Sequence, residues 1–363
     1  MNYPQPKKGI LDIKAYVPGA SLANGKPAHK MSSNESCLGP SPLALQAFQD
    51  ALHNLNRYPN GNLAPLIPAL TKATGLDREQ LLIGNGSEEI LALLAITYLE
   101  RGDCAIMSKY GFETYKIQTI AAGATPILID EHDFRVDIEA IIASVHANPH
   151  CKVVFIANPG NPTGTYLIHE EIKHLQANIP PHVLLVLDSA YAEFVEDEAY
   201  HAGEDLVSQT QNVVMIRTFS KAYGMAGLRV GWLYGPRHLV AAVNQIRCPF
   251  NVGVAAQAAA AAALEDQKFL QESVAYHQHW RQFLARALTN MGLSVTPSTT
   301  NFLLVHFPDD PLYNAQKADT FLKNNGYIAR PVHDYSLPNA LRISVGKPEE
   351  NEEIIAILRK FLP

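Results

Sequence analysis

Short apolar runs, separated by longer segments of helical pattern, dominate the chain from residue 81 to residue 247. The runs contain few polar positions and have the length of strands: Leu81–Ile83, Cys104–Met107, Cys151–Ala157, Val183–Leu187 and Val213–Ile216. Continuous apolar strands are typical of a parallel sheet buried on both faces, whereas a half-exposed strand alternates between apolar and polar residues. We therefore expect an α/β fold with a mostly parallel sheet covered by helices.

Beyond residue 250 the pattern changes to longer helices and fewer strands. An alanine-rich run from Ala255 to Leu264 predicts a closely packed helix at a subdomain or subunit boundary, and residues 266–291 continue as helix. Strand patterns at 302–305 and 341–345 alternate with helical patterns at 315–325 and 349–362. We expect residues 41–262 to form a large domain and residues 263–363 a smaller α+β domain. The polar residues 1–40 are expected to form an arm and part of the smaller domain.

The residues best suited to chemistry lie where predicted strands end. They are Ser87, Phe112, Asn161, Asp188, Tyr191 and Lys221. Parallel strands end at one edge of the sheet, and such sheets bind their ligands there. Asp188 follows five apolar residues directly, so its burial requires a cationic partner. The shared position of these residues is more informative than any single motif.

A strand, a glycine turn and a helix follow one another around Gly84–Ser87. The unpaired N–H groups and the dipole of a helix N-terminus make such a junction suitable for a phosphate, here at Gly86 and Ser87. The alternative is an ordinary capped helix, with Ser87 as the N-cap and Glu88 and Glu89 in the first turn. The acidic side chains weigh against a phosphate, but backbone N–H groups can bind it whatever the side chains do.

Lys221 lies where an apolar strand gives way to a glycine-rich turn. A lysine amine in this position is able to form a Schiff base with an aldehyde cofactor. Thr218, Ser220 and Arg229 offer two hydroxyls and a planar cation for a phosphate. Small residues beside a lysine occur in many loops, so this stretch alone does not identify a site.

Together these residues suit pyridoxal 5′-phosphate. Lys221 would hold the aldehyde, and Asp188 would keep the pyridine nitrogen protonated so that the ring becomes an electron sink. Asn161 and Tyr191 would donate hydrogen bonds to the phenolate oxygen, and Phe112 would stack on the ring. The phosphate would bind at Gly86, Ser87 and Glu88, with Thr218, Ser220 and Arg229 around it. Once freed, Lys221 would act as general base and acid.

The amino-acid composition argues for some classes of protein and against others. Apolar residues make up 47% and charged residues 18%, which suits a globular protein with a large core. The net charge of −6 argues against nucleic-acid binding. The four cysteines are far apart and form no CxxC pair, so we expect no metal site and a cytoplasmic location. No apolar run approaches the roughly 20 residues of a membrane span.

The chain resembles the histidinol-phosphate aminotransferase family of fold-type I, pyridoxal-phosphate-dependent enzymes. The stretches that carry the resemblance span nearly the whole chain in the family's order: Tyr16–Gly19, Asn34-Glu35, Arg57–Pro59, Gly84–Ser87, Asn158–Gly164, Asp188–Tyr191, Arg217–Lys221, Arg330-Pro331 and Leu341–Ser344. The resemblance implies a large domain with a mostly parallel seven-stranded sheet, a smaller α+β domain, and a homodimer.

The resemblance also implies roles for residues outside the cofactor set. Tyr58 would reach the neighbouring subunit's cofactor phosphate, and Arg330 and Arg342 would bind the anionic end of the substrate. Tyr16 and Asn34 would line the substrate entrance. The chain departs from the family at Ser36-Cys37, where Asn-Pro is frequent, and at Tyr110, where proline is common. These departures affect the residues expected near the substrate and leave the cofactor-binding residues unchanged.

The reaction implied is ping-pong transamination between L-histidinol phosphate and 2-oxoglutarate. Transamination of phenylalanine or tyrosine is the alternative, because related sequences share these motifs. A different reaction is decarboxylation of an amino-acid phosphate, which depends on angles that a sequence does not reveal. A non-enzymatic alternative, the cofactor-binding part of a transcription regulator, is disfavoured because a DNA-binding region has no room before residue 30.

Overall fold

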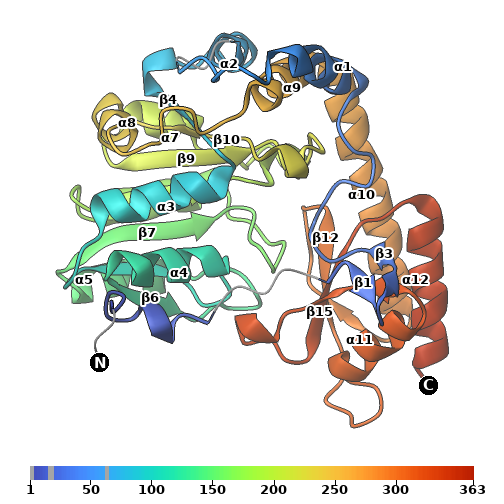
Figure 1. Ribbon diagram of the computed structural model, residues 1–363. Helices are drawn as coiled ribbons and strands as arrows, with labels where there is room; N and C mark the ends of the chain where they lie inside the picture. Colours follow the sequence, from blue (N-terminus) through green and yellow to red (C-terminus); the bar gives the residue numbers. More distant parts are fainter. Residues whose placement is uncertain (1–3, 15–19, 62–64) are drawn as a thin grey trace.

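The computed structural model describes residues 4–14, 20–61 and 65–363, and two larger β-sheets organise them (Figure 1). The seven-stranded sheet has the order β4-β10-β9-β8-β7-β5-β6, and the four-stranded sheet has the order β11-β12-β15-β14. The first lies on the left of Figure 1 and the second at the lower right. Among the described helices, none is long and apolar enough to cross a membrane.

The seven-stranded sheet is formed by β4 (Leu81–Gly84), β5 (Cys104–Ser108), β6 (Thr125–Ile129), β7 (Cys151–Ala157), β8 (Leu184–Asp188), β9 (Val213–Thr218) and β10 (Gly231–Tyr234). Strands β6, β5, β7, β8 and β9 pair in parallel, and β10 runs antiparallel to both β9 and β4. The predicted mostly parallel sheet is confirmed. Every residue of β4, β5, β8 and β10 is buried, which explains their continuous apolar sequences.

Helices cover both faces of this sheet. One face packs against α3 (Ser87–Tyr98), α4 (Glu113–Ala122) and α8 (Arg237–Asn244). The other packs against α1 (Pro42–Ala51), α2 (Leu66–Thr74), α5 (Ile138–Ala147), α6 (His169–Asn178), α7 (Glu204–Gln209) and α9 (Val254–Glu265). The predicted alanine-rich helix is α9. Its buried alanines lie against α1 and α2, where small side chains allow the helices to approach closely.

The C-terminal part packs helices on one face of the four-stranded sheet. Its elements are α10 (Gln267–Asn290), β11 (Ser294–Val295), β12 (Phe302–His306), α11 (Ala315–Asn324), β13 (Tyr327–Ile328), β14 (Arg330–Pro331), β15 (Ala340–Ser344) and α12 (Pro348–Phe361). Residues of α10, α11, α12, β12 and β15 share one apolar core. Short 3₁₀ helices lie at Ile10–Asp12, Leu52–Asn54, Arg78–Gln80, Ala192–Phe194, Ala226–Leu228 and His333–Tyr335.

The N-terminal segment contains short strands that the sequence pattern did not predict. They are β1 (Leu22–Ala23), β2 (Lys26–Pro27) and β3 (His29–Lys30). Strand β3 pairs in parallel with β13, so this segment lies against the C-terminal part of the chain. The division at residues 40 and 262 stays a prediction.

Candidate active site

A cavity of about 350 Å³ opens at the carboxyl ends of the parallel strands, and residues of the C-terminal part and of the N-terminal segment complete its wall. It brings together twelve of the residues singled out from the sequence: Asn34, Ser87, Glu88, Phe112, Asn161, Asp188, Tyr191, Thr218, Ser220, Lys221, Arg229 and Arg342. The strand ends gather them because β7, β8 and β9 run side by side in the same direction.

Lys221 lies three residues beyond the end of β9, in the turn that follows. Its Nζ is 3.5 Å from the carbonyl oxygen of Ser33 and 5.6 Å from the ring centre of Tyr191. Burial, helped by the positive charge of Arg342, lowers the pKa of Lys221 to about 8. A larger fraction of the amine is therefore neutral near pH 7, as both a nucleophile and a general base require.

Asp188 is the last residue of β8 and is 5% exposed. Its Oδ2 accepts a 2.7 Å hydrogen bond from the Tyr115 hydroxyl, whereas its buried Oδ1 has no hydrogen-bond partner among the described residues. Burial raises the pKa of Asp188 to about 6, against the lowering effect of that hydrogen bond. A buried carboxylate oxygen at a cavity wall suits a cationic N–H group in the cavity.

The turn before α3 is held close to Arg229. Gly86, not Ser87, is the N-cap of α3, and its φ of +79° is in the left-handed region. A Cβ at Gly86 would lie 2.4 Å from Nη2 of Arg229, so only glycine fits here. The prediction of Ser87 as N-cap is therefore wrong by one residue. The N-terminus of α3 has no side-chain cap hydrogen bond.

Arg229 and two hydroxyls lie beside this helix end. Nη1 of Arg229 is 3.3 Å from Oγ of Ser220, and Thr218 donates a 3.0 Å hydrogen bond to the same Oγ. Nη2 lies 3.1 Å from a carboxylate oxygen of Glu88. Arg229 itself has a φ of +53°, and β10 begins two residues later, at Gly231. This group of donors fits a phosphate.

Two residues from outside the large sheet are tied to its strand ends. Asn34 donates a 2.8 Å hydrogen bond to the hydroxyl of Tyr191. Arg342 of β15 donates from Nη1 to Oδ1 of Asn161 at 2.5 Å and from Nη2 to the carbonyl oxygen of Ser32 at 2.7 Å. Burial raises the pKa of Tyr191 to about 12, so its hydroxyl keeps its proton at neutral pH and remains a donor.

Three of the predicted site residues do not line the cavity, and a fourth lies outside the described residues. Gly86 lies directly behind the wall, against Arg229. Tyr58 is 82% exposed and stacks on Phe250 at 4.7 Å between ring centres. Arg330 on β14 pairs in register with Arg342 but is not part of the wall. Tyr16 lies outside the described residues. The functions expected of Tyr58, Arg330 and Tyr16 stay predictions.

The sequence patterns missed several residues of the wall: Lys30, Glu35, Tyr115 and Tyr335. Tyr115 lies one helical turn after Phe112 and so faces the same way. Lys30 is paired with Glu35 at 3.0 Å, and both line the cavity. Lys30 left no sequence signal because β3 has only two residues.

The arrangement of donors fits one kind of ligand. An anion site at Arg229, an amine at Lys221 and an unsatisfied carboxylate oxygen at Asp188 face the same cavity, whose wall includes the ring of Phe112. These features match a planar cofactor with a phosphate at one end, an aldehyde, and a ring nitrogen that carries a proton. Pyridoxal 5′-phosphate has this set of groups.

Comparisons with known proteins agree with this geometry. Residues 26–358 match the family model described as aminotransferase class I and II. The histidinol-phosphate aminotransferase of Nitrobacter winogradskyi is 48% identical, covering 100% of this chain and 99% of that protein. That of Rhodopseudomonas palustris (strain BisA53) is 46% identical, with the same coverage.

Solved structures share the fold. The histidinol-phosphate aminotransferase of Sinorhizobium meliloti, in complex with pyridoxal 5′-phosphate, superposes with a TM-score of 0.90 at 28% identity, covering 99% of this chain and 98% of that chain. A Thermus thermophilus aspartate aminotransferase variant superposes with a TM-score of 0.85 at 21% identity, covering 99% and 100%. The second likeness concerns the fold alone.

Proposed function

The chain belongs to the family of class I and II aminotransferases, and on that premise we propose that it transfers the amino group of L-histidinol phosphate to 2-oxoglutarate. The observation that carries the proposal is the cavity in which Lys221 and the unsatisfied oxygen of Asp188 face the same space. Relatives that are 46–48% identical over the full chain and are named histidinol-phosphate aminotransferases support the choice of substrate.

Pyridoxal 5′-phosphate, when bound, supplies the electron sink that makes the α-proton of the amino donor removable. Thr218, Ser220, Arg229 and the N-terminus of α3 would hold its phosphate end, and Phe112 would pack on its ring. Asp188 would keep a proton on the ring nitrogen through Oδ1, which is buried, since Oδ2 is already engaged by Tyr115. Tyr191, oriented by Asn34, and Asn161, oriented by Arg342, would bind the ring oxygen.

Lys221 moves the proton. Once the donor's amine has displaced Lys221 from the cofactor aldehyde, the free Nζ of Lys221 would take the proton from the α-carbon of the donor and would give it to the former aldehyde carbon. A pKa of about 8 lets the amine act as base and then as acid near neutral pH. The amine lies inside the cavity, 5.6 Å from the ring centre of Tyr191. The same steps in reverse deliver the amino group to 2-oxoglutarate.

Arginines bind the anionic end of each substrate. Arg342 is buried and fixed by Asn161 and Ser32, with its guanidinium 5.4 Å from the ring centre of Phe302. We assign to it, with Arg330 on the neighbouring strand, the phosphate of histidinol phosphate and the carboxylate of 2-oxoglutarate. Tyr16, which lies outside the described residues, stays a predicted substrate-binding residue.

The proposal includes a symmetric homodimer in the cytoplasm. Tyr58 reaches the cofactor phosphate of the other subunit, and its 82% exposure in one protomer supports this assignment. Leu52, Leu55, Ile246 and Phe250 are also exposed apolar residues, as expected of a surface that a second subunit covers. All four cysteines are free thiols, which supports a reducing compartment.

Transfer of labelled nitrogen tests the reaction. Purified, cofactor-loaded protein is incubated with ¹⁵N-labelled L-histidinol phosphate and 2-oxoglutarate, and the products are quantified by mass spectrometry. One labelled glutamate should form for each donor consumed. Failure to label glutamate would remove the proposed reaction. A parallel incubation with a phosphorylated amino acid should release no carbon dioxide, because release would indicate decarboxylation instead.

A further inference from the structure

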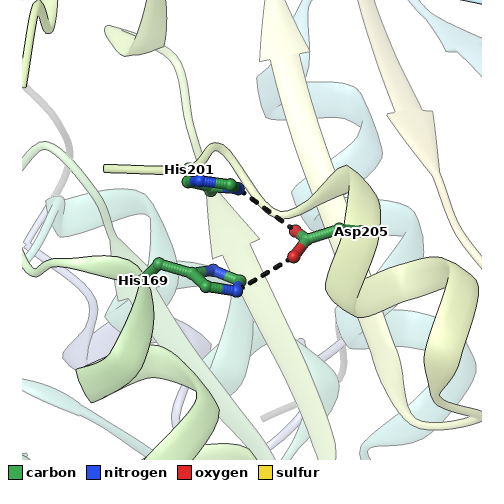
Figure 2. A group of neighbouring side chains, drawn as sticks. All are labelled: His169, His201 and Asp205. Carbon is green, nitrogen blue, oxygen red and sulfur yellow. Dashed lines mark ion pairs between the residues drawn. The ribbon is translucent and has the colours of Figure 1, made fainter. Parts of the chain in front are cut away.

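Two histidines and an aspartate meet on a face of the molecule outside the cavity wall (Figure 2). Nε2 of His169 lies 2.9 Å from Oδ2 of Asp205, and Nδ1 of His201 lies 3.8 Å from Oδ1 of the same carboxylate. Figure 2 shows both rings pointing a nitrogen toward the two carboxylate oxygens. The potential ligand atoms of the three residues all lie within 4.8 Å of one another.

Backbone hydrogen bonds hold the three side chains near one another, although His169 is remote in sequence from the other two residues. His169 is the first residue of α6, and its N–H donates a 2.7 Å hydrogen bond to the carbonyl oxygen of Ala199. His201 follows in the same segment, and Asp205 lies in the first turn of α7. The segment is held further by Tyr200, which donates a 2.8 Å hydrogen bond to the carbonyl oxygen of Asn158.

An ordinary ion pair accounts for only part of this geometry. His169 and Oδ2 of Asp205 are within hydrogen-bond distance, but Oδ1 is buried and has no hydrogen-bond partner among the described residues. The distance of 3.8 Å from His201 to Oδ1 is too long for a hydrogen bond. The two imidazole rings are stacked at 4.3 Å between centres, so a nitrogen of each lies near the carboxylate. A shared cation would supply the partner that Oδ1 of Asp205 lacks.

We propose that His169, His201 and Asp205 bind a divalent transition-metal ion of the zinc type. Two imidazole nitrogens and one carboxylate oxygen suit Zn²⁺, whereas Mg²⁺ and Ca²⁺ prefer oxygen ligands alone. At Zn–ligand distances of about 2.0–2.1 Å, ligand atoms in a tetrahedral site lie about 3.3 Å apart. The group is wider than this, and the side chain of His201, which is 48% exposed, moves to close it. Water takes the remaining position.

The ion would link the segment between β8 and β9 to α6. Ser189, next to Asp188 at the end of β8, donates a 2.7 Å hydrogen bond to the carbonyl oxygen of Ala202 in this segment. Glu204, beside Asp205, pairs at 3.0 Å with Nη1 of Arg217 in β9. Metal binding therefore stabilises the connection between two strands that carry site residues. The proposal does not depend on which amino donor the enzyme uses.

Zinc titration of untagged, cofactor-loaded protein tests the site. Wild-type protein should bind one equivalent of Zn²⁺ at this site and melt at a higher temperature in its presence. In His201→Ala and Asp205→Asn the affinity should fall at least about tenfold. His174→Ala is the matched control, because His174 lies on α6 and is paired at 2.8 Å with Glu139 but belongs to no group of three potential metal ligands in the described part of the chain. This variant should bind Zn²⁺ like the wild type.

The absorption spectrum of bound Co²⁺ distinguishes nitrogen and oxygen ligands from cysteine sulfur. Co²⁺ in the wild-type protein should give visible absorption bands without the sulfur charge-transfer band that cysteine ligands such as Cys37 or Cys248 would add. The bands should disappear in Asp205→Asn. Two results would overturn the proposal: no stoichiometric Zn²⁺ binding by the wild type, or equal binding by wild type and Asp205→Asn. Neither result bears on transamination.

Discussion

The hydroxyl of Tyr115 donates a 2.7 Å hydrogen bond to Oδ2 of Asp188, whereas the other oxygen of this carboxylate, Oδ1, has no hydrogen-bond partner among the described residues. Tyr115 is itself fully enclosed and stacks on Phe155 at 5.0 Å between ring centres. Burial raises the pKa of Tyr115 well above its usual value, so the tyrosine remains a donor. The carboxylate is thereby fixed in one orientation before any cofactor binds.

Replacing Asp188 by asparagine should leave the fold intact but lower kcat about 100-fold or more, because the ring nitrogen loses the carboxylate that keeps it protonated. Tyr115→Phe is the companion variant. It keeps the ring but loses one hydrogen bond to the carboxylate, so kcat should fall only about tenfold. Steady-state kinetics with a melting curve for each variant provide the check. Wild-type kcat in Asp188→Asn would mean that another carboxylate has this function.

The pH dependence of cofactor attachment should report the lowered pKa of Lys221. Protonated lysine cannot attack an aldehyde, so the rate of binding to apoprotein should rise with pH with a midpoint near pH 8. Burial lowers this pKa from its usual value of 10.5, and the positive charge of Arg342 adds to the effect. Arg342→Gln should therefore move the midpoint to higher pH. Stopped-flow absorbance measures the rate, and a wild-type midpoint near 10.5 would refute this account.

Gly86→Ala should weaken cofactor binding by about tenfold or more through displacement of Arg229. The new Cβ would lie 2.4 Å from Nη2 and 2.9 Å from Cζ of that arginine, in a left-handed backbone conformation. Gly253→Ala is a matched control, because its Cβ meets nothing within 4 Å and its φ is −62°. Equilibrium titration of apoprotein gives the dissociation constants. Combined with Arg229→Gln, Gly86→Ala should add little further loss, since both act on one contact.

Much of the fold and the cofactor side of the cavity could be predicted from the sequence. Strands buried on both faces leave continuous apolar runs, and β8 therefore identified Asp188 as the polar residue at a strand end. Lys221 and Arg229 follow strand β9 within one turn region, so a local motif contained both. Local patterns succeed where neighbours in sequence are also neighbours in space.

Residues that meet through tertiary structure were harder to predict. The hydrogen bond between Tyr115 and Asp188 joins α4 to β8, and an aromatic residue beside a strand is most often simply core. Lys30 lies on a strand of two residues that pairs with β13, which is too short to leave a periodic pattern. The group of His169, His201 and Asp205 was missed because its first member is remote in sequence and no ligand spacing marks it.

Hybrid dimers should reveal whether Tyr58 acts in the neighbouring subunit. At limiting cofactor, Lys221→Ala and Tyr58→Phe proteins should each be weakly active. When the two proteins are mixed and their subunits exchange, about half of the dimers become hybrids, and each hybrid contains one complete site out of two. Activity should therefore rise to about a quarter of the wild type. Mixing Tyr58→Phe with the double variant Lys221→Ala/Tyr58→Phe should give no such gain. Equal activity of the two mixtures would place Tyr58 outside the partner's site.

The most direct test of the proposed function is a comparison of kcat/KM for three amino donors. Cofactor-loaded wild-type protein is assayed with saturating 2-oxoglutarate and either L-histidinol phosphate, phenylalanine or tyrosine. We expect kcat/KM for histidinol phosphate to exceed the other two by about 100-fold or more, because Arg342 and its neighbours bind a phosphate more strongly than a carboxylate. Equal or higher values for phenylalanine or tyrosine would contradict the assignment and identify the protein as an aromatic aminotransferase.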